Sequence, residues 1–357
     1  MLQACYPLFE ASKIEAIEWS FDALYKRRNI PDWFLQLLHA FANEGRLIGH
    51  GVFFSLFSGR WTYEQQAWLK HLSKVSSAFR FDHITEHFGF MTGADFHSGA
   101  PLSIPYTNTT LTIGKDRLAR IYDACGKPVG LENLAFSYDI DEVKRHGDFL
   151  SKLIEPVNGF IILDLHNLYC QLQNFSVGVD EIINLYPLER VREIHISGGS
   201  WEDSIIDIGR KIRRDTHNDA VPQEVFALLE YAIDKCPNLK YVILEQVGGA
   251  LHTQQSREDF AADFLKMSAI VKQAKGLPPE TNDFLPKELI IPALVAEDEE
   301  LHQQQTELSE IFETAAGYDD ALMRLQQSSL ANSDWQIENW APYMLETAIS
   351  IAQKWKK

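Results

Sequence analysis

A run of apolar residues that leads into an acid, within residues 159–167, constrains the fold of this 357-residue chain most strongly. Four apolar residues precede Asp164, and His166 and Asn167 follow it. An unbroken apolar run of this length is typical of a strand that is buried on both faces, as in a parallel sheet. An acid, an imidazole and an amide are costly to bury at the end of such a strand unless they bind something.

The same pattern of an apolar run with polar residues at its end recurs along the chain. Further examples end at Glu86-His87, Glu132-Asn133, His195 and Glu245. Helical patterns lie between most of these strands, and such alternation indicates a parallel sheet. Seven strands are clear, and we interpret residues 1–5 as the stub of an eighth. We therefore predict an α/β fold, a TIM (β/α)₈ barrel whose strand ends converge on one polar site.

The predicted strands span residues 14–20, 46–54, 81–87, 128–133, 159–164, 191–197 and 241–245. The predicted helices span residues 7–13, 32–43, 62–79, 111–125, 140–154, 179–185, 223–235 and 257–274. Two long polar loops, at residues 89–108 and 198–222, interrupt the alternation, and loops this long are usually functional or disordered. A doubly wound open sheet is the alternative, but it would place a glycine-rich phosphate-binding turn after an early strand, and neither GxGxxG nor GxxxxGK(S/T) occurs.

The composition changes after residues 276–279, which read Gly-Leu-Pro-Pro. The remainder has helical spacing, is acidic at residues 297–300 and is rich in glutamine at residues 303–305. We therefore predict two parts, a metal-binding catalytic barrel in residues 1–275 and a helical extension in residues 276–357.

The net charge limits the possible binding partners, and the cysteines indicate the cellular compartment. A net charge of −17 argues against a nucleic-acid backbone or an anionic membrane as the main partner. No apolar run approaches the ~20 residues that a membrane span needs, and no secretory signal pattern follows Met1. The four cysteines are far apart and form no CxxC motif. We therefore expect reduced thiols in a cytoplasmic protein that binds neither nucleic acid nor membrane.

Barrel enzymes place their catalytic groups at the carboxyl ends of the strands and in the loops that follow. The candidates there are His50, Glu86, His87, Glu132, Asn133, Asp164, His166, Asn167, His195, Asp215, His217 and Glu245. Neutral imidazoles with carboxylates suit iron, manganese or zinc, and their number exceeds the ligands of a single zinc ion. We predict two or three metals bridged by carboxylates. Glu86 has an alternative role, which is to orient His87.

Single histidines at strand ends are more often structural than ligating. We assign the remaining histidines of the barrel and the extension, apart from His252, to surface or packing positions. They are His39, His71, His83, His97, His146 and His302.

The order of the motifs resembles the multinuclear non-heme iron-dependent oxidative enzymes, once catalogued as domain of unknown function 692. That family carries HG, SEH, EN, DxxN, EIH, DTH and LIE motifs. In this chain the corresponding residues are His50-Gly51, Thr85-Glu86-His87, Glu132-Asn133, Asp164 to Asn167, Glu193-Ile194-His195, Asp215-Thr216-His217 and Leu244-Glu245. The resemblance covers roughly residues 14–250, and the set in this order is specific although each motif alone is weak.

The resemblance implies a xylose-isomerase-like TIM barrel that holds two or three iron ions in mixed Fe(II)/Fe(III) states. It implies that the ligands are His50, His87, Glu132, Asp164, Asn167, His195, Asp215, His217 and Glu245. The implied activity is an O₂-dependent modification of a ribosomally synthesised precursor peptide, commonly at cysteine. A small partner protein often delivers the peptide in this family.

Several positions depart from the family pattern. His166 stands where relatives usually have asparagine, and Gln246 replaces the acid after the last glutamate. The family's opening strand is missing or shortened, and the helical extension is not a common feature. We assign Asp164, His166 and Glu245 as catalytic residues and predict that His166 is an additional ligand or a substrate contact.

Two other functions fit the same residues. A divalent-metal isomerase or phosphodiesterase of the xylose-isomerase-like barrels shares the histidine and carboxylate pattern but is redox-silent. A DNA-repair nuclease of that group would need a basic groove, which the acidic charge disfavours. A barrel that binds a peptide without catalysis is the third possibility, and it predicts that the ligands are present but hold no metal.

Overall fold

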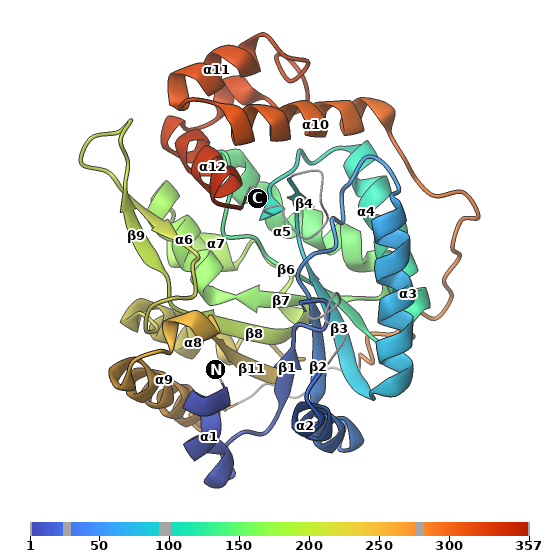
Figure 1. Ribbon diagram of the computed structural model, residues 1–357, viewed down its shortest axis with the longest axis vertical. Coiled ribbons are helices and arrows are strands. Elements are labelled where there is room, and N and C mark those ends of the chain that lie inside the picture. The colour runs from blue at the N-terminus through green and yellow to red at the C-terminus, as the bar shows by residue number, and fades with distance from the viewer. Residues whose placement is uncertain (1, 24–29, 93–100, 276–281, 356–357) are drawn as a thin grey trace.

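Seven parallel strands form the central sheet of the computed structural model, which describes residues 2–23, 30–92, 101–275 and 282–355 (Figure 1). In sheet order they are β1 (Ile17–Trp19), β2 (Leu47–Gly51), β3 (Phe81–His87), β6 (Val129–Glu132), β7 (Phe160–Asp164), β8 (Val191–Ser197) and β11 (Tyr241–Glu245). Side chains of opposite strands meet across the interior, since Glu193 on β8 lies 2.7 Å from His83 on β3. The sheet is therefore curled into a nearly closed barrel, which confirms the predicted fold class.

The prediction of an eighth strand in residues 1–5 is wrong, because residues Leu2–Glu10 form helix α1. Ala4, Cys5 and Leu8 have helical spacing, and they pack on Leu251 and Phe260. In the described part of the chain, β1 pairs only with β2 and β11 only with β8. The barrel is therefore open between β1 and β11.

Helices cover the outside of the barrel, as the alternation predicted. They are α2 (Asp32–Asn43), α3 (Tyr63–Ala78), α4 (Asn108–Cys125), α5 (Ile140–Ile154), α6 (Leu165–Phe175), α7 (Val179–Ile183), α8 (Gln223–Ile233) and α9 (Gln254–Gln273). Short 3₁₀ turns lie at Glu155–Val157, Leu188–Arg190, Gly248–Ala250 and Ile337–Asn339. None of the described helices is both long enough and apolar enough to cross a membrane.

Helix α6 was not predicted, and it changes the place of two candidate residues. Asp164 ends β7 and also caps α6, because its carboxylate accepts the backbone N–H of Asn167 at 2.6 Å. His166 and Asn167 therefore lie on the first turn of a helix and not in a loop.

Two hairpins stand where we predicted loops. β9 (Ser200–Asp203) and β10 (Lys211–Arg214) are antiparallel and lie within the expected loop 198–222. β4 (Phe90–Met91) and β5 (Pro101–Leu102) form a short pair within the expected loop 89–108. Residues 93–100 of that loop, with His97, lie outside the described residues.

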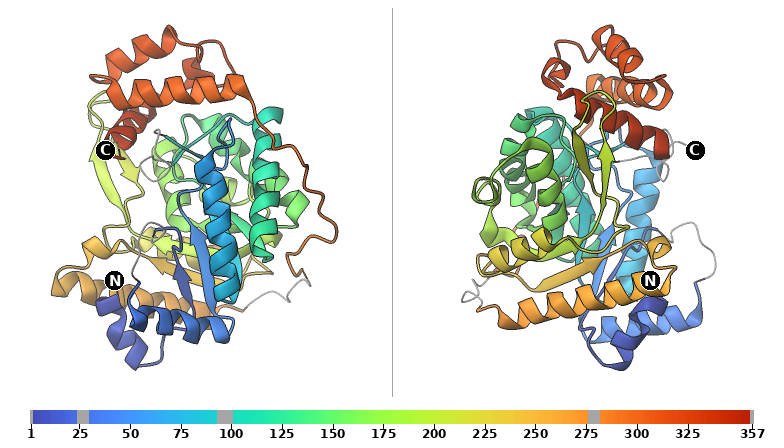
Figure 2. Two further views of the ribbon diagram at one scale, coloured as in Figure 1. Left: turned by 45° about the vertical axis from the view of Figure 1, so that its right-hand side comes forward. Right: turned by 90° about the vertical axis from the view of Figure 1, so that its left-hand side faces the viewer.

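The helical extension packs over the loops at the carboxyl end of the strands (Figure 2). It contains α10 (Glu299–Thr314), α11 (Tyr318–Gln326) and α12 (Pro342–Trp355). Trp340 stacks on Tyr138 with ring centroids 3.8 Å apart. Gln305 accepts a bond from the backbone of Gly59 and donates one to Phe57. The division at residue 275 stays a prediction, and residues 276–281 lie outside the described residues.

Candidate metal centre

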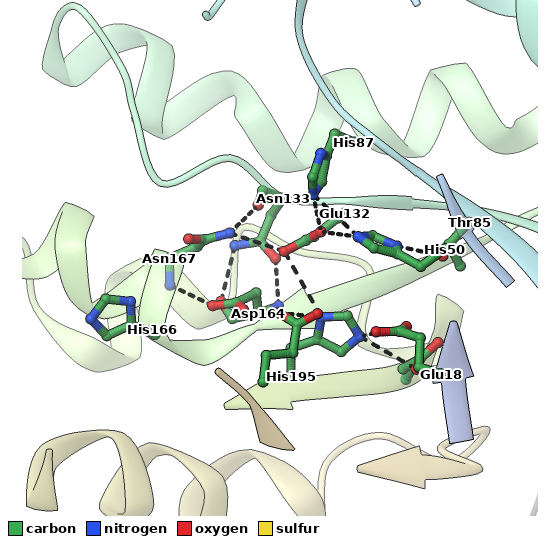
Figure 3. Close-up of polar contacts among 12 residues, drawn as sticks. Glu18, His50, Thr85, His87, Glu132, Asn133, Asp164, His166, Asn167 and His195 are labelled. Atoms are coloured by element: carbon green, nitrogen blue, oxygen red, sulfur yellow. Dashed lines mark hydrogen bonds and ion pairs between the residues drawn. The ribbon is translucent and has the colours of Figure 1, made fainter. Parts of the chain in front are cut away.

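Three side chains from neighbouring strands meet at the carboxyl end of the barrel (Figure 3). Glu132 Oε2 lies 3.1 Å from His87 Nε2 and 3.5 Å from His50 Nε2. The Nδ1 atom of His50 is 2.8 Å from the hydroxyl of Thr85, which turns Nε2 toward the group. Burial lowers the pKa of His50 to about 4, so this ring is neutral at pH 7. Its Nε2 lone pair is available to a metal.

A second group shares Glu132 with the first. It contains Glu132, Asp164, His195 and Glu245, with one donor atom from each within 4.8 Å of all the others. His195 Nδ1 lies 3.2 Å from Glu245 Oε2 and 4.0 Å from Glu132 Oε1. Glu132 thus turns one oxygen toward each group. Burial and the charges of Glu132 and Asp215 raise the pKa of Asp164 well above its ordinary value.

The pair Asp215 and His217 adjoins the second group. It follows β10, and His217 Nε2 lies 2.9 Å from Asp215 Oδ1. His217 Nδ1 lies 3.9 Å from Glu245 Oε2. His217 has φ +50, in the left-handed region that few non-glycine residues adopt. The structure therefore brings these predicted ligands together with the others.

Several buried donor atoms in these groups receive no hydrogen bond from the described residues. They are Glu132 Oε2, Asp164 Oδ2, Asn167 Oδ1 and His195 Nδ1. Buried carboxylates this close together repel one another, and cations between them would relieve that cost. Imidazole nitrogens with carboxylate oxygens suit iron, manganese or zinc. The residues present therefore fit a multinuclear metal centre.

Asparagines hold the ligands in place. Asn133 donates to the backbone carbonyl of Asp164 at 3.1 Å and accepts from its N–H at 2.7 Å. Asn167 donates to Glu132 Oε1 at 3.2 Å. Glu86 is fully buried, and its Oε1 accepts the backbone N–H of His87. The asparagine contacts join the ends of β6 and β7, and the Glu86 contact holds the end of β3.

His166 lies beside the centre with both ring nitrogens paired. Nδ1 is 3.0 Å from Asp215 Oδ1, and Nε2 accepts from the guanidinium of Arg213 at 3.0–3.1 Å. The side chain is fully buried. The predicted role of His166 as a ligand or substrate contact would require one of these two bonds to break.

A chain of buried charged groups continues below the centre. His195 Nε2 lies 3.3 Å from both Glu18 and Glu193. Glu193 in turn lies 2.7 Å from His83, and His83 lies 2.9 Å from Asp82. Burial opposes the charge on His83, but the two flanking carboxylates raise its pKa. The ring of His195 is thereby fixed with Nδ1 toward the metal ligands.

Sequence reasoning missed this chain of groups. We had assigned His83 to a surface or packing position and gave Glu18 and Glu193 no role. The available signal was the alternation of side chains along a strand. Glu193 lies two residues before His195, so both side chains point to the same face, and His83 has the same relation to Thr85.

The centre opens into a cavity of about 840 Å³. Seven of the predicted ligands line it: His50, His87, Glu132, Asn167, Asp215, His217 and Glu245. Ligand-binding pockets commonly span about 300–1,000 Å³. A substrate can therefore reach the ligands from this cavity.

Replacing Glu132 by Gln should remove metal from both groups, because a neutral amide cannot bridge two cations as a carboxylate does. We expect metal content per chain, measured by mass spectrometry after purification without O₂, to fall by about half or more. Glu132→Ala and His195→Ala should lose metal as well. Glu142→Gln is the control, since this carboxylate accepts the backbone N–H of Tyr138 instead. Full metal content in Glu132→Gln would show that the ligand assignment is wrong.

Replacing His83 by Gln should weaken metal binding although His83 touches no predicted ligand. Glu193 would lose the imidazole that lies 2.7 Å from it and would no longer fix His195. Loss of such a supporting contact typically costs about 10–100-fold in metal affinity. His146→Gln is the matched control, a buried histidine that accepts a bond from the backbone of Leu134. Equal metal affinity in the two variants would contradict the supporting role.

Metal loading at pH 7 should release protons. Burial would lower the pKa of His217, but Asp215 raises it to about 10, so the metal-free ring is protonated. A metal-bound imidazole has lost that proton, and apparent affinity should rise with pH toward about 10. Because the pKa of His217 in the folded protein exceeds the ordinary 6.5, protonation of His217 stabilises the folded, metal-free protein. This stabilisation is fully present below about pH 6.5 and is lost as the pH rises through about 10.

Calorimetry of metal binding in two buffers of different ionisation enthalpy measures the released protons. Binding at pH 7 without proton release would contradict a protonated His217. The His146→Gln variant should release the same number as the unchanged protein.

Comparisons with solved structures give weak likenesses to other barrels. Endonuclease IV from Thermus thermophilus is 14% identical, with a TM-score of 0.47, over 76% of this chain and 95% of that chain. An L-ribulose 3-epimerase is 11% identical, with a TM-score of 0.46, over 77% of this chain and 90% of that chain.

Curated relatives carry the name UPF0276 protein. The one from Chromobacterium violaceum is 28% identical over 144 residues, which cover 40% of this chain and 50% of that protein. The one from Acaryochloris marina is 25% identical over 193 residues, which cover 52% of this chain and 64% of that protein. The chain spans about half the length of the curated relatives it matches.

The family model described as RiPP precursor modification enzyme MbnB/TglH/ChrH matches residues 28–256, which is more than half of the chain. All nine predicted ligands lie within the match. This confirms the family resemblance that the motifs indicated, and the chain belongs to the MbnB/TglH/ChrH family of RiPP precursor modification enzymes.

Proposed function

We propose that the protein oxidises a side chain of a ribosomally synthesised precursor peptide, with O₂ as co-substrate and two or three iron ions as cofactor. Cysteine is the side chain that we favour. The observation that carries the proposal is the position of Glu132. One of its oxygens faces His50 and His87, and the other faces His195. A carboxylate in this position suits a bridge between two metal ions.

When bound, iron supplies the one-electron chemistry with O₂ that protein side chains lack. The residues of the chain supply position and charge. Glu245 lines the cavity and lies between His195 and His217, which hold its pKa well below the ordinary value against the effect of burial. It therefore stays ionised beside the substrate space.

The other two proposed catalytic residues act from deeper positions. Asp164 contributes one free carboxylate oxygen, because the other caps α6. His166 acts through Asp215, whose orientation it fixes. Asn167 completes the proposed ligand set beside Glu132.

The proposed setting is the cytoplasm, and all four cysteines are unpaired and buried. The proposed partner is the precursor peptide, with a small peptide-delivering protein as a second component. The acidic net charge supports neither nucleic acid nor an anionic membrane as a ligand.

Metal analysis of protein purified without O₂ tests the proposal. We expect two or three irons per chain by Mössbauer spectroscopy and O₂ uptake when a cysteine-bearing precursor peptide is added, with a mass change in the peptide. Glu132→Gln is the inactive control. One or two zinc or manganese ions without O₂ uptake would favour the redox-silent isomerase or phosphodiesterase. A chain that binds no metal under any condition would favour the non-catalytic barrel.

A further inference from the structure

Helix α12 of the extension supplies one wall of the cavity that holds the metal ligands. Its residues Met344, Thr347, Ile351 and Lys354 line that cavity together with His87 and Glu245. Their spacing of three and four residues places them in one stripe along the helix. We refer to these four residues as the α12 stripe.

The other face of α12 packs within the extension. Leu345, Ala348, Ile349 and Ala352 are buried in the apolar core that also contains Phe312 and Leu325. The helix therefore has two distinct faces. One face stabilises the extension, and the α12 stripe lines the cavity. Met344 and Thr347 of the stripe are almost fully buried, and Ile351 is the half-buried residue that presents apolar surface.

Contacts with the barrel fix the first half of α12. The backbone N–H of Ala341 donates to the carbonyl of Tyr138 at 3.0 Å, and the hydroxyl of Tyr343 donates to the carbonyl of Asn174 at 2.9 Å. Glu346 accepts the hydroxyl of Ser204 at 2.6 Å and the N–H of Ile205 at 2.9 Å. Figures 1 and 2 show α12 between the rest of the extension and the carboxyl end of the barrel. The stripe is thus held in one position against the cavity.

The barrel contributes apolar and adaptable side chains to the same cavity. Met91 lies on β4, and Phe136 follows β6. Methionine side chains adapt to different apolar partners because they are unbranched and polarisable. With Ile351 of the α12 stripe, these residues give part of the cavity an apolar lining, while Lys354 lies at the exposed end of the stripe.

From these contacts we infer that the α12 stripe binds the precursor peptide beside the residue to be modified and selects apolar side chains at the flanking positions. This inference rests on the proposed function, since it assumes that the occupant of the cavity is the substrate peptide. Continuity carries it, because the cavity that holds the ligands also extends along the stripe, so a peptide seated at the ligands can contact the stripe.

Two substitutions on adjacent residues of α12 test the inference. Ile351→Arg places a charge in the α12 stripe, whereas Ser350→Arg places the same charge on the exposed face of the same helix. Both variants should load metal as the unchanged protein does, because neither residue touches a ligand. Ile351→Ala serves as a milder third variant, should Ile351→Arg fail to fold.

The probes are two labelled synthetic peptides, one with cysteine flanked by leucine and valine and one with cysteine flanked by asparagine and serine, so that the two carry the same charge. Binding to the metal-loaded protein is measured by fluorescence anisotropy without O₂, so its outcome does not depend on the oxidation. The unchanged protein and Ser350→Arg should bind the apolar peptide about tenfold more tightly than the polar one. Ile351→Arg should lose about tenfold in affinity for the apolar peptide, and Ile351→Ala about threefold.

Equal affinity for both peptides, no binding of either, or unchanged binding in Ile351→Arg and Ile351→Ala would each overturn the inference. The proposed function fails separately, if the protein holds no iron or consumes no O₂ with its precursor peptide.

Discussion

The crowding of carboxylates around Glu132 is the constraint on which the rest of the centre depends. Glu132, Asp164 and Glu245 bring donor atoms within 4.8 Å of one another and of His195. Such a group is costly to bury without cations, so each strand end must be held rigidly against repulsion. Asn133 provides that hold by bonding both backbone groups of Asp164, which fixes β6 to β7 at the point where the acids meet.

Charged side chains also fill the barrel interior below the ligands. Barrel interiors are usually filled by branched apolar side chains, but here acids and imidazoles alternate from His195 through Glu193 and His83 to Asp82. Each imidazole lies between carboxylates, so each of these acids has an imidazole beside it. At the lower end of this series, the centroid of the apolar Phe160 ring lies 4.8 Å from the centroid of the His83 ring. The alternating charged groups thus support the orientation of one ligand, His195.

The sequence predicted most strands because they depend on local pattern, and the proposed ligands were chosen from the same pattern. An apolar run that ends in a polar residue marks a buried strand and its carboxyl end, as at Asp164 and Glu245. Helix α6 was missed because Asp164 both ends a strand and caps a helix. The sequence pattern indicated only the strand end. The hairpin β9–β10 was missed because its charged residues pair across strands only in the folded chain. The strand expected at residues 1–5 came from a count of strands and not from the residues themselves. His83 and Glu193 were missed because their role depends on how deep in the barrel interior they lie.

Metal ligands and α12 both line the cavity, but the family match covers the ligands and not α12. All nine predicted ligands lie within residues 28–256, the span of the family match, whereas α12 lies outside it. Helix α12 is linked to the centre through Tyr343, which bonds the carbonyl of Asn174, and the Asn174 side chain bonds the backbone of Arg213, two residues before Asp215. A substitution at Ile351, on the second half of the helix, leaves these bonds in place. Conversely, the packing of Leu345 and Ile349 within the extension involves no ligand. The chemistry of the centre and the selection of what approaches it are carried by separate segments of the chain, so that substrate choice can change by substitutions in one helix while the metal site is kept.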